Sequence, residues 1–435
     1  MKRVRLSRRQ FLCHTSAAAA LAVPVAAAAQ AGSPSVALPP AIAALTSMRG
    51  QATPITADER RGRLERARAL MAESQLGAIV LTGSTSLTYF TGLRWGNSER
   101  LMALIVPQRG EPFVVLPAFE EDRLHEQMAG GPLASARLFT WQEDESPYAL
   151  VAQALRDRGL ATGRIGVEET MRFVFSDGLA SAAPALSFTS GTPVIAGCRM
   201  VKDAHELALM TVACQATLRC YDAVYRSLAP GMPASAVSGL VNAAYGRLGF
   251  PGFASVQVGE FTALPHGSST PQTITDGTVV MMDDGCVAEG YQSDLTRTFV
   301  VGRATDRMRR VFDVVKRAQA AALAAARPGV GLGAVDAAAR KVVADAGFGP
   351  GYAYFTHRLG DGIGMDMHEW PYLVPNNMFG WDRTLTARPG MTFSDEPGVY
   401  IRGEFGIRLE DILVITPDGA RLLTEPSPSL DQPFG

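Results

Sequence analysis

The chain has 435 residues, of which 47% are hydrophobic, and its formal net charge at pH 7 is −1. This length provides for two sizeable hydrophobic cores. The balanced charge argues against a nucleic-acid partner, which a strongly basic chain would favour.

The first 31 residues have the pattern of an export signal. Basic residues precede the sequence SRRQFL at 7–12, an alanine-rich apolar stretch follows, and small residues end it at Ala31. Paired arginines in this context are typical of twin-arginine signals, so we expect cleavage and a periplasmic or secreted protein. A Sec signal or a membrane anchor fits less well, because the apolar run is short and contains Pro24. No later stretch reaches the roughly 20 apolar residues that span a bilayer, so we expect no membrane contact after cleavage.

The N-terminal half is predicted to be an α/β domain. Residues 32–54 are rich in Pro, Ala, Ser and Thr and are predicted to form a linker. Strands that alternate with helices then predict a domain over 55–195. Apolar periodicity and turn residues predict helices at 57–76 and 148–158 and strands at 78–81, 101–106, 112–116 and 164–167.

A second domain is predicted over 196–425, with a short tail at 426–435. Its pattern begins with two long helices, continues with β-like segments, and then repeats the same order. Two rounds of a helix pair followed by antiparallel strands predict a pseudo-symmetric α+β domain. The second helix pair is predicted at 306–326 and 335–346.

Four acidic residues of this domain stand in contexts that suit a metal site. Asp283 and Asp294 flank a Gly-Tyr turn, so a β-hairpin would bring both carboxylates into one cleft. Glu396 follows a strand-like segment, and Glu410 lies within the apolar sequence GIRLEDILV. An acidic side chain inside an apolar strand is costly unless it is paired or bound to a metal. We therefore predict a carboxylate-rich site for divalent ions.

These segments resemble, in order and in local sequence, the pita-bread metallopeptidases of the prolidase and aminopeptidase P branch. The resemblance covers about residues 55–425 and implies an α/β creatinase-like N-terminal domain followed by an α+β pita-bread domain. It also implies hydrolysis of the amide bond before proline in short peptides, as a dipeptidase or an aminopeptidase. The matching motifs are PHG at 265–267, DxG at 283–285, GYxxDxTRTF at 290–299, THR at 356–358, MHE at 367–369, EPGxY at 396–400 and RxED at 408–411.

The resemblance implies a role for each acidic residue. Asp283 would bind one metal, Asp294 and Glu410 would bridge two metals, and Glu396 would bind the second. Glu396 would also accept the proton of the attacking water. The implied cofactor is a pair of divalent ions, Mn²⁺ in the first place, with Co²⁺ or Zn²⁺ as alternatives.

The resemblance further implies roles for residues around the metals. His266 and His368 match the outer histidines, which stabilise the developing oxyanion and relay a proton to the leaving amine. His357 matches a histidine of the pocket wall, whereas Arg408 and Thr296 would support the ligands. Taken singly, each histidine would more often be a hydrogen-bonded structural residue. A homodimer is also implied.

In prolidases, a basic residue in the region before the segment that matches Glu396 contacts the carboxylate of the substrate. Arg383 and Arg388 precede Glu396, and the resemblance implies this contact for one of them. Whether such an enzyme is a dipeptidase or an aminopeptidase depends on the loops that close the cleft, and the sequence does not decide between the two.

One position departs from the family pattern. Asp361 lies between two glycines, where the family has a histidine as its fifth metal ligand. Aspartate binds Mn²⁺, Mg²⁺ or Ca²⁺, but it is shorter than imidazole and adds a negative charge. Because four carboxylates already balance two divalent ions, a fifth would leave the site one unit negative and its bound water less acidic.

Three functions therefore stay open. The first is a metallopeptidase in which Asp361 is an accepted ligand. The second is a weak or silent relative that acts as a binding protein. The third is a metal-poor amidinohydrolase similar to creatinase, against which the four acidic residues argue, because creatinase-type members lose most of these ligands.

Overall fold

The computed structural model describes residues 37–434, and the predicted signal at 1–31 lies outside the described residues. The described elements from Pro39 onward belong to one unit. Within residues 37–434, none of the helices combines the length and the apolar character needed to cross a bilayer.

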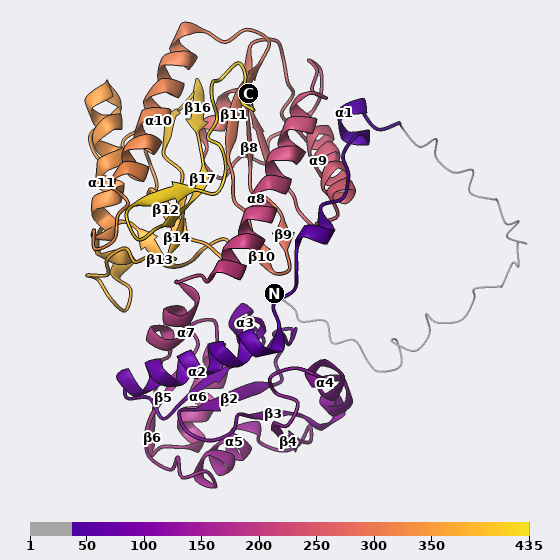
Figure 1. Cartoon of the computed structure of the whole chain (residues 1–435), viewed down its shortest axis with the longest axis vertical. Coiled ribbons are helices and arrows are strands. Elements are labelled where there is room, and N and C mark those ends of the chain that lie inside the picture. Colours follow the sequence, from indigo (N-terminus) through magenta and orange to yellow (C-terminus); the bar gives the residue numbers. More distant parts are fainter. Residues whose placement is uncertain (1–36, 435) are drawn as a thin grey trace, which may run out of the picture. The chain divides into compact units, whose positions relative to one another are not determined.

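The N-terminal domain is built on a mixed sheet of six strands in the order β4-β3-β2-β1-β5-β6 (Figure 1). All four residues of the central strand β1 are buried, as expected for a strand covered on both faces. The strands are β1 (Ala78–Leu81), β2 (Ala103–Pro107), β3 (Phe113–Pro117), β4 (Arg137–Trp141), β5 (Gly163–Val167) and β6 (Leu186–Ser190). The helices are α2 (Ala57–Glu73), α3 (Thr85–Thr91), α4 (Glu121–Met128), α5 (Pro147–Arg156), α6 (Phe173–Ala182) and α7 (Thr192–Arg199).

The stretch before this domain differs from the predicted linker. It forms the short helix α1 (Pro40–Ala43) and a 3-10 turn at Arg49–Gln51. Ile42 and Met48 are buried in the core of the second domain, and the Met48 amide donates a hydrogen bond to the carbonyl of Leu248 at 2.9 Å. The prediction of a tether was wrong here because a few apolar residues, rather than the average composition, decide whether a segment packs.

The C-terminal domain contains two helix pairs, each followed by strands, as predicted. Figure 1 shows α8 beside α9 and α10 beside α11. The first pair precedes the three-stranded sheet β11-β8-β7 and the hairpin β9-β10, and the second pair precedes the sheet β13-β12-β14-β17-β18 and the pair β15-β16. The helices are α8 (Ala204–Tyr225), α9 (Ala234–Leu248), α10 (Asp306–Ala325) and α11 (Leu332–Val343).

The strands of this domain are short and end close to the acidic residues of the predicted site. They are β7 (Ser255–Val258), β8 (Thr278–Asp283), β9 (Val287–Ala288), β10 (Tyr291–Gln292), β11 (Arg297–Val301), β12 (Gly360–Gly362), β13 (Glu369–Leu373), β14 (Thr392–Asp395), β15 (Gly398–Ile401), β16 (Phe405–Arg408), β17 (Asp411–Ile415) and β18 (Ala420–Leu422).

A buried polar network joins the two domains next to the site. Arg63 on α2 donates from Nη2 to the hydroxyl of Tyr291 at 2.8 Å, and this hydroxyl donates to Oε1 of Glu206 on α8, also at 2.8 Å. Tyr291 belongs to the β9-β10 hairpin, three residues before Asp294. The network therefore fixes the hairpin that carries one of the predicted ligands.

Candidate metal centre

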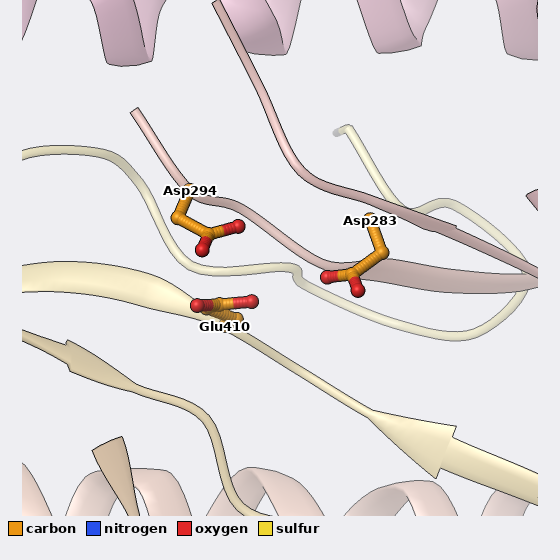
Figure 2. Close-up of side chains that lie close together, drawn as sticks. All are labelled: Asp283, Asp294 and Glu410. Atoms are coloured by element: carbon orange, nitrogen blue, oxygen red, sulfur yellow. The ribbon is translucent and has the colours of Figure 1, made fainter. Parts of the chain in front are cut away.

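Three carboxylates converge from separate strand ends (Figure 2). Asp283 is the last residue of β8, Asp294 follows β10, and Glu410 lies between β16 and β17. Each offers one oxygen such that all three oxygens lie within 4.8 Å of one another. Because β8 and β11 pair antiparallel, the chain between them returns Asp294 to the end of β8, which confirms the predicted approach of the two aspartates.

The cluster is unfavourable without a cation. Burial raises the pKa of Asp294 and of Glu410 well above the ordinary range, and the negative charges of neighbouring carboxylates raise each pKa further. The positive charge of Arg408 lowers both pKa values but does not cancel these effects. Buried like charges of this kind need a positive partner. Three hard oxygen ligands in one place therefore fit a divalent ion.

Glu396 faces the same cavity, which has a volume of about 730 Å³ and is also lined by the three clustered carboxylates. It follows β14, and the hydroxyl of Ser394 donates to its Oε1 at 3.0 Å. Burial, together with the charges of Asp361 and Asp283, raises the pKa of Glu396 to about 8, although Arg408 acts in the opposite direction. The charge of the Glu396 carboxylate is therefore costly in the metal-free site, as it is for Asp294 and Glu410.

Arg408 and Thr296, predicted to support the ligands, contact two of them. Arg408 forms an ion pair from Nη2 with Asp283 and donates from Nε to the hydroxyl of Thr296 at 2.9 Å. The Thr296 hydroxyl lies 2.7 Å from Oε2 of Glu410. Arg408 also donates to the hydroxyl of Tyr400 at 3.1 Å. A buried cation thus holds Asp283 in place from the side of the protein.

The three predicted histidines all line the cavity. His266 and His368 are exposed, so both can reach a bound molecule. His357 is half-buried, with Nε2 at 2.7 Å from the hydroxyl of Tyr400 and Nδ1 at 2.7 Å from the carbonyl of Arg358. Burial and the nearby charge of Arg408 lower the pKa of His357 to about 3, so this imidazole is neutral at physiological pH. These contacts suit the predicted wall position.

Asp361 also lines the cavity, but both of its carboxylate oxygens contact protein groups. Oδ1 forms an ion pair with Nε of Arg358, and Oδ2 lies 3.2 Å from Nε2 of His368. Its backbone amide donates to the hydroxyl of Ser394 at 2.8 Å. Within the described residues, the convergent carboxylate group does not include Asp361. Its role as a fifth ligand stays a prediction.

The sequence did not single out Arg358 as a residue of the site. It lines the cavity, whereas Arg383 and Arg388, from which a substrate contact was expected, do not. The guanidinium of Arg383 lies over the ring of Phe379, 5.1 Å from its centroid, and Arg388 contacts a methionine sulfur. The sequence did contain an indication that Arg358 belongs to the site, since it precedes Asp361 by three residues and carries the opposite charge.

Comparison with known proteins gives the family. Residues 208–417 match the model of metallopeptidase family M24, and residues 63–201 match the creatinase/prolidase N-terminal domain. The chain is 37% identical over 361 residues to a probable dipeptidase, PepE, of Mycobacterium tuberculosis, an alignment that spans 82% of this chain and 92% of that protein. The chain belongs to metallopeptidase family M24. The predicted fold class is thereby confirmed.

Two further relatives match this M24 peptidase over nearly their whole length. An Xaa-Pro dipeptidase of Lactobacillus delbrueckii subsp. lactis is 29% identical over 380 residues, which cover 84% of this chain and 98% of that protein. The crystal structure of dipeptidase PepE from Mycobacterium ulcerans superposes with a TM-score of 0.79 at 34% identity, covering 87% of this chain and 99% of that chain. The protein is therefore an enzyme of the metallopeptidase class, which uses divalent metal ions.

Proposed function

We propose that this M24 peptidase is an exported Xaa-Pro dipeptidase, which hydrolyses the amide bond before proline at a centre of two divalent ions. The observation that carries the proposal is the convergence of Asp283, Asp294 and Glu410 in a cavity that Glu396 also lines. The volume of that cavity, about 730 Å³, lies within the range of small-ligand sites and suits a short peptide. Relatives named dipeptidase and Xaa-Pro dipeptidase support the substrate class.

Four carboxylates would hold the ions: Asp283, Asp294, Glu396 and Glu410. Asp361 occupies the position of the family's histidine. When bound, the ions would polarise the carbonyl of the substrate and make a bound water more acidic. Because every one of these ligands is a hard oxygen, we propose Mn²⁺ before Co²⁺ or Zn²⁺.

The residues of the chain would carry the proton and hold the substrate. Glu396, which lines the cavity beside the three clustered carboxylates, accepts the proton of the attacking water. His266 and His368 are exposed in the cavity, and they donate hydrogen bonds to the carbonyl oxygen as negative charge develops on it. The proton then reaches the proline nitrogen as the amide bond breaks. Arg408 keeps Asp283 oriented throughout.

The proposal extends to the location and the assembly of the enzyme. The pattern at 1–31 supports export by the twin-arginine route to the periplasm or the medium. Replacing both arginines of the pair at positions 8 and 9 by lysine should keep the protein in the cytoplasm, which fractionation of cells measures. The family resemblance supports a homodimer, which light scattering of the purified protein tests.

The test of the activity uses the mature protein from residue 32. The protein is incubated with Mn²⁺, Co²⁺ or Zn²⁺ and desalted, its metal content is measured, and the same samples are assayed with Ala-Pro, Gly-Pro and Ala-Ala. We expect about two ions per chain and faster hydrolysis of the two proline substrates. Glu396→Gln, which removes the proton acceptor, should abolish turnover. A protein that binds no metal and cleaves none of the dipeptides would contradict the proposal.

A further inference from the structure

Asp361 is held by its surroundings on every side. It lies in β12, which pairs with β13 and with β14, and the register of the β12-β13 pair shifts between Asp361 and Gly362. Such an irregularity re-aims a side chain relative to the regular pleat. A Cβ at Gly360 would collide with the carbonyl of Ser394, so the backbone on this side of Asp361 is packed against β14. The direction of the Asp361 side chain is therefore set by the sheet.

The partner of Asp361, Arg358, is equally fixed. Its guanidinium stacks over the ring of Tyr372, 4.6 Å from the centroid, and its Nη1 lies 2.7 Å from Sδ of Met378. Its Nε is thereby turned to Oδ1 of Asp361. To bind a metal through Oδ1, Asp361 would have to leave this ion pair, which would leave a half-buried guanidinium without its counter-charge.

Among Arg358, Asp361 and His368, only His368 has no second polar side-chain contact within residues 37–434. Its side chain is 56% exposed, whereas that of Asp361 is 5% exposed, and the two approach to 3.2 Å between Nε2 and Oδ2. An exposed imidazole samples several rotamers unless a partner holds it. A buried, immobile carboxylate at this distance fixes the ring and favours the form with a hydrogen on Nε2. The other nitrogen, Nδ1, then faces a bound molecule, and it can donate to a carbonyl oxygen when the ring carries a hydrogen on both nitrogens.

We propose that Asp361 is a positioning residue for His368 and not a fifth metal ligand, with Arg358 holding Asp361 in that role. The inference rests on the proposed function, in which His368 contacts the carbonyl oxygen of the substrate. Asp361, which replaces the family's histidine, thus orients the side chain of His368. The buried Asp361 lies between the half-buried Arg358 and the exposed His368, and all three side chains line the cavity.

The deciding variant is Asp361→Asn in the full mature protein, which keeps the shape of the side chain and removes its charge. Titration calorimetry with Mn²⁺ should give the wild-type number of ions, with a Kd changed by less than about threefold, because no ligand has been lost. Steady-state hydrolysis of Ala-Pro should show kcat reduced by about 10–100-fold, as is usual when the partner of a functional histidine is removed, and KM changed by less than about threefold. Loss of one ion per chain would overturn the proposal.

A double-mutant cycle with His368→Gln separates positioning from a merely structural role. If Asp361 acts through His368, adding Asp361→Asn to His368→Gln should lower kcat by less than about twofold further. Full multiplication of the two single effects would contradict the proposal, and so would an unchanged kcat in Asp361→Asn alone. Asp366→Asn is the matched control, because this carboxylate lies on the loop that carries His368 but pairs with Arg199 and Thr85 outside the metal cavity. It should leave kcat unchanged.

A second variant covers the case in which Asp361→Asn does not fold. Arg358→Met together with Asp361→Asn removes both charges, so that neither is left buried alone, and the metal count of this variant again decides whether Asp361 is a ligand. A wild-type protein that binds metal but cleaves no Xaa-Pro substrate would refute the proposed function. The metal titration would still decide the question of the ligand, so the two failures are distinguishable.

Discussion

Glu396 should make the stability of the metal-free protein depend on pH. Its pKa is about 8 in the folded protein against an ordinary value of 4.5, so the folded state holds the proton more tightly than the unfolded state. This stabilisation is complete below pH 4.5 and is lost as the pH rises to about 8. Between pH 6.5 and 8, at about 1.36 kcal/mol per unit, the group loses on the order of 2 kcal/mol of unfolding free energy.

Other titratable groups beside Glu396 also affect the stability between pH 6.5 and 8. The pKa of His357 is lowered from 6.5 to about 3 by burial, so its contribution to stability is complete above pH 6.5 and stays constant from there upward. Burial and the charge of Asp283 raise the pKa of Asp284 to about 7, which adds a loss of less than about 1 kcal/mol at the acidic end of the window. Asp294 and Glu410, whose pKa values are also raised well above the ordinary range, lose stability in the same direction, so the sum falls by more than the share of Glu396 alone.

Urea unfolding of chelator-treated protein at pH 6.5, 7.2 and 8 measures the effect. Glu396→Gln should reduce the fall between pH 6.5 and 8 by about 2 kcal/mol, since the amide does not titrate. Mn²⁺ at a fixed concentration, about 100 times its Kd at pH 6.5, should add about 2.7 kcal/mol at that pH and more at higher pH, because metal ligands bind in their charged form and the Kd then falls. The reasoning fails if the metal-free wild type is equally stable at all three pH values, or if Glu396→Gln shows the same fall.

Three substitutions test other contacts. Arg408→Met removes the buried cation beside Asp283 and should weaken Mn²⁺ binding by about 10–100-fold in calorimetry; an unchanged Kd would mean that Arg408 does not orient the ligand. Tyr291→Phe deletes the hydroxyl that donates to Glu206 and should lower the unfolding free energy by about 1–3 kcal/mol in urea. Asp395→Val should raise it by about 1–3 kcal/mol, because neither oxygen of this fully buried carboxyl has a partner within the described residues, and a loss of stability would reveal a missed donor.

The pattern of apolar residues predicted those helices and strands whose buried residues recur regularly within the element itself. The strand expected at 78–81 is β1, and the helix expected at 306–326 is α10 (Asp306–Ala325). Composition misled at 32–54, where Ile42 and Met48 pack against α8 and α9 although polar and small residues surround them. A single buried side chain can anchor a segment of this length, and no average over the segment reveals its partner.

The candidate site was predictable where a ligand and its context are close in sequence. Asp283 and Asp294 are joined by one hairpin, so their meeting follows from strand pairing alone. The contacts of Asp361 were not predictable, because they depend on a register shift in β12 and on the stacking of Arg358 against a strand that follows. Arg358 lies three residues before Asp361, and the strand that holds Asp361 is irregular. The direction of neither side chain can therefore be derived before the sheet is known.

The structure changes the net charge expected for the proposed metal centre. Counting ligand positions alone, Asp361 adds a fifth negative charge to four that two divalent ions already balance, and the bound water would be less acidic. Arg358 cancels that charge within the protein, because its guanidinium pairs with Asp361 directly. Arg408 supplies a further positive charge beside Asp283. With both arginines counted, two bound ions would leave the centre one unit positive, which a hydroxide would neutralise. An aspartate at this position is therefore compatible with an acidic metal-bound water, provided that Arg358 stays paired with it.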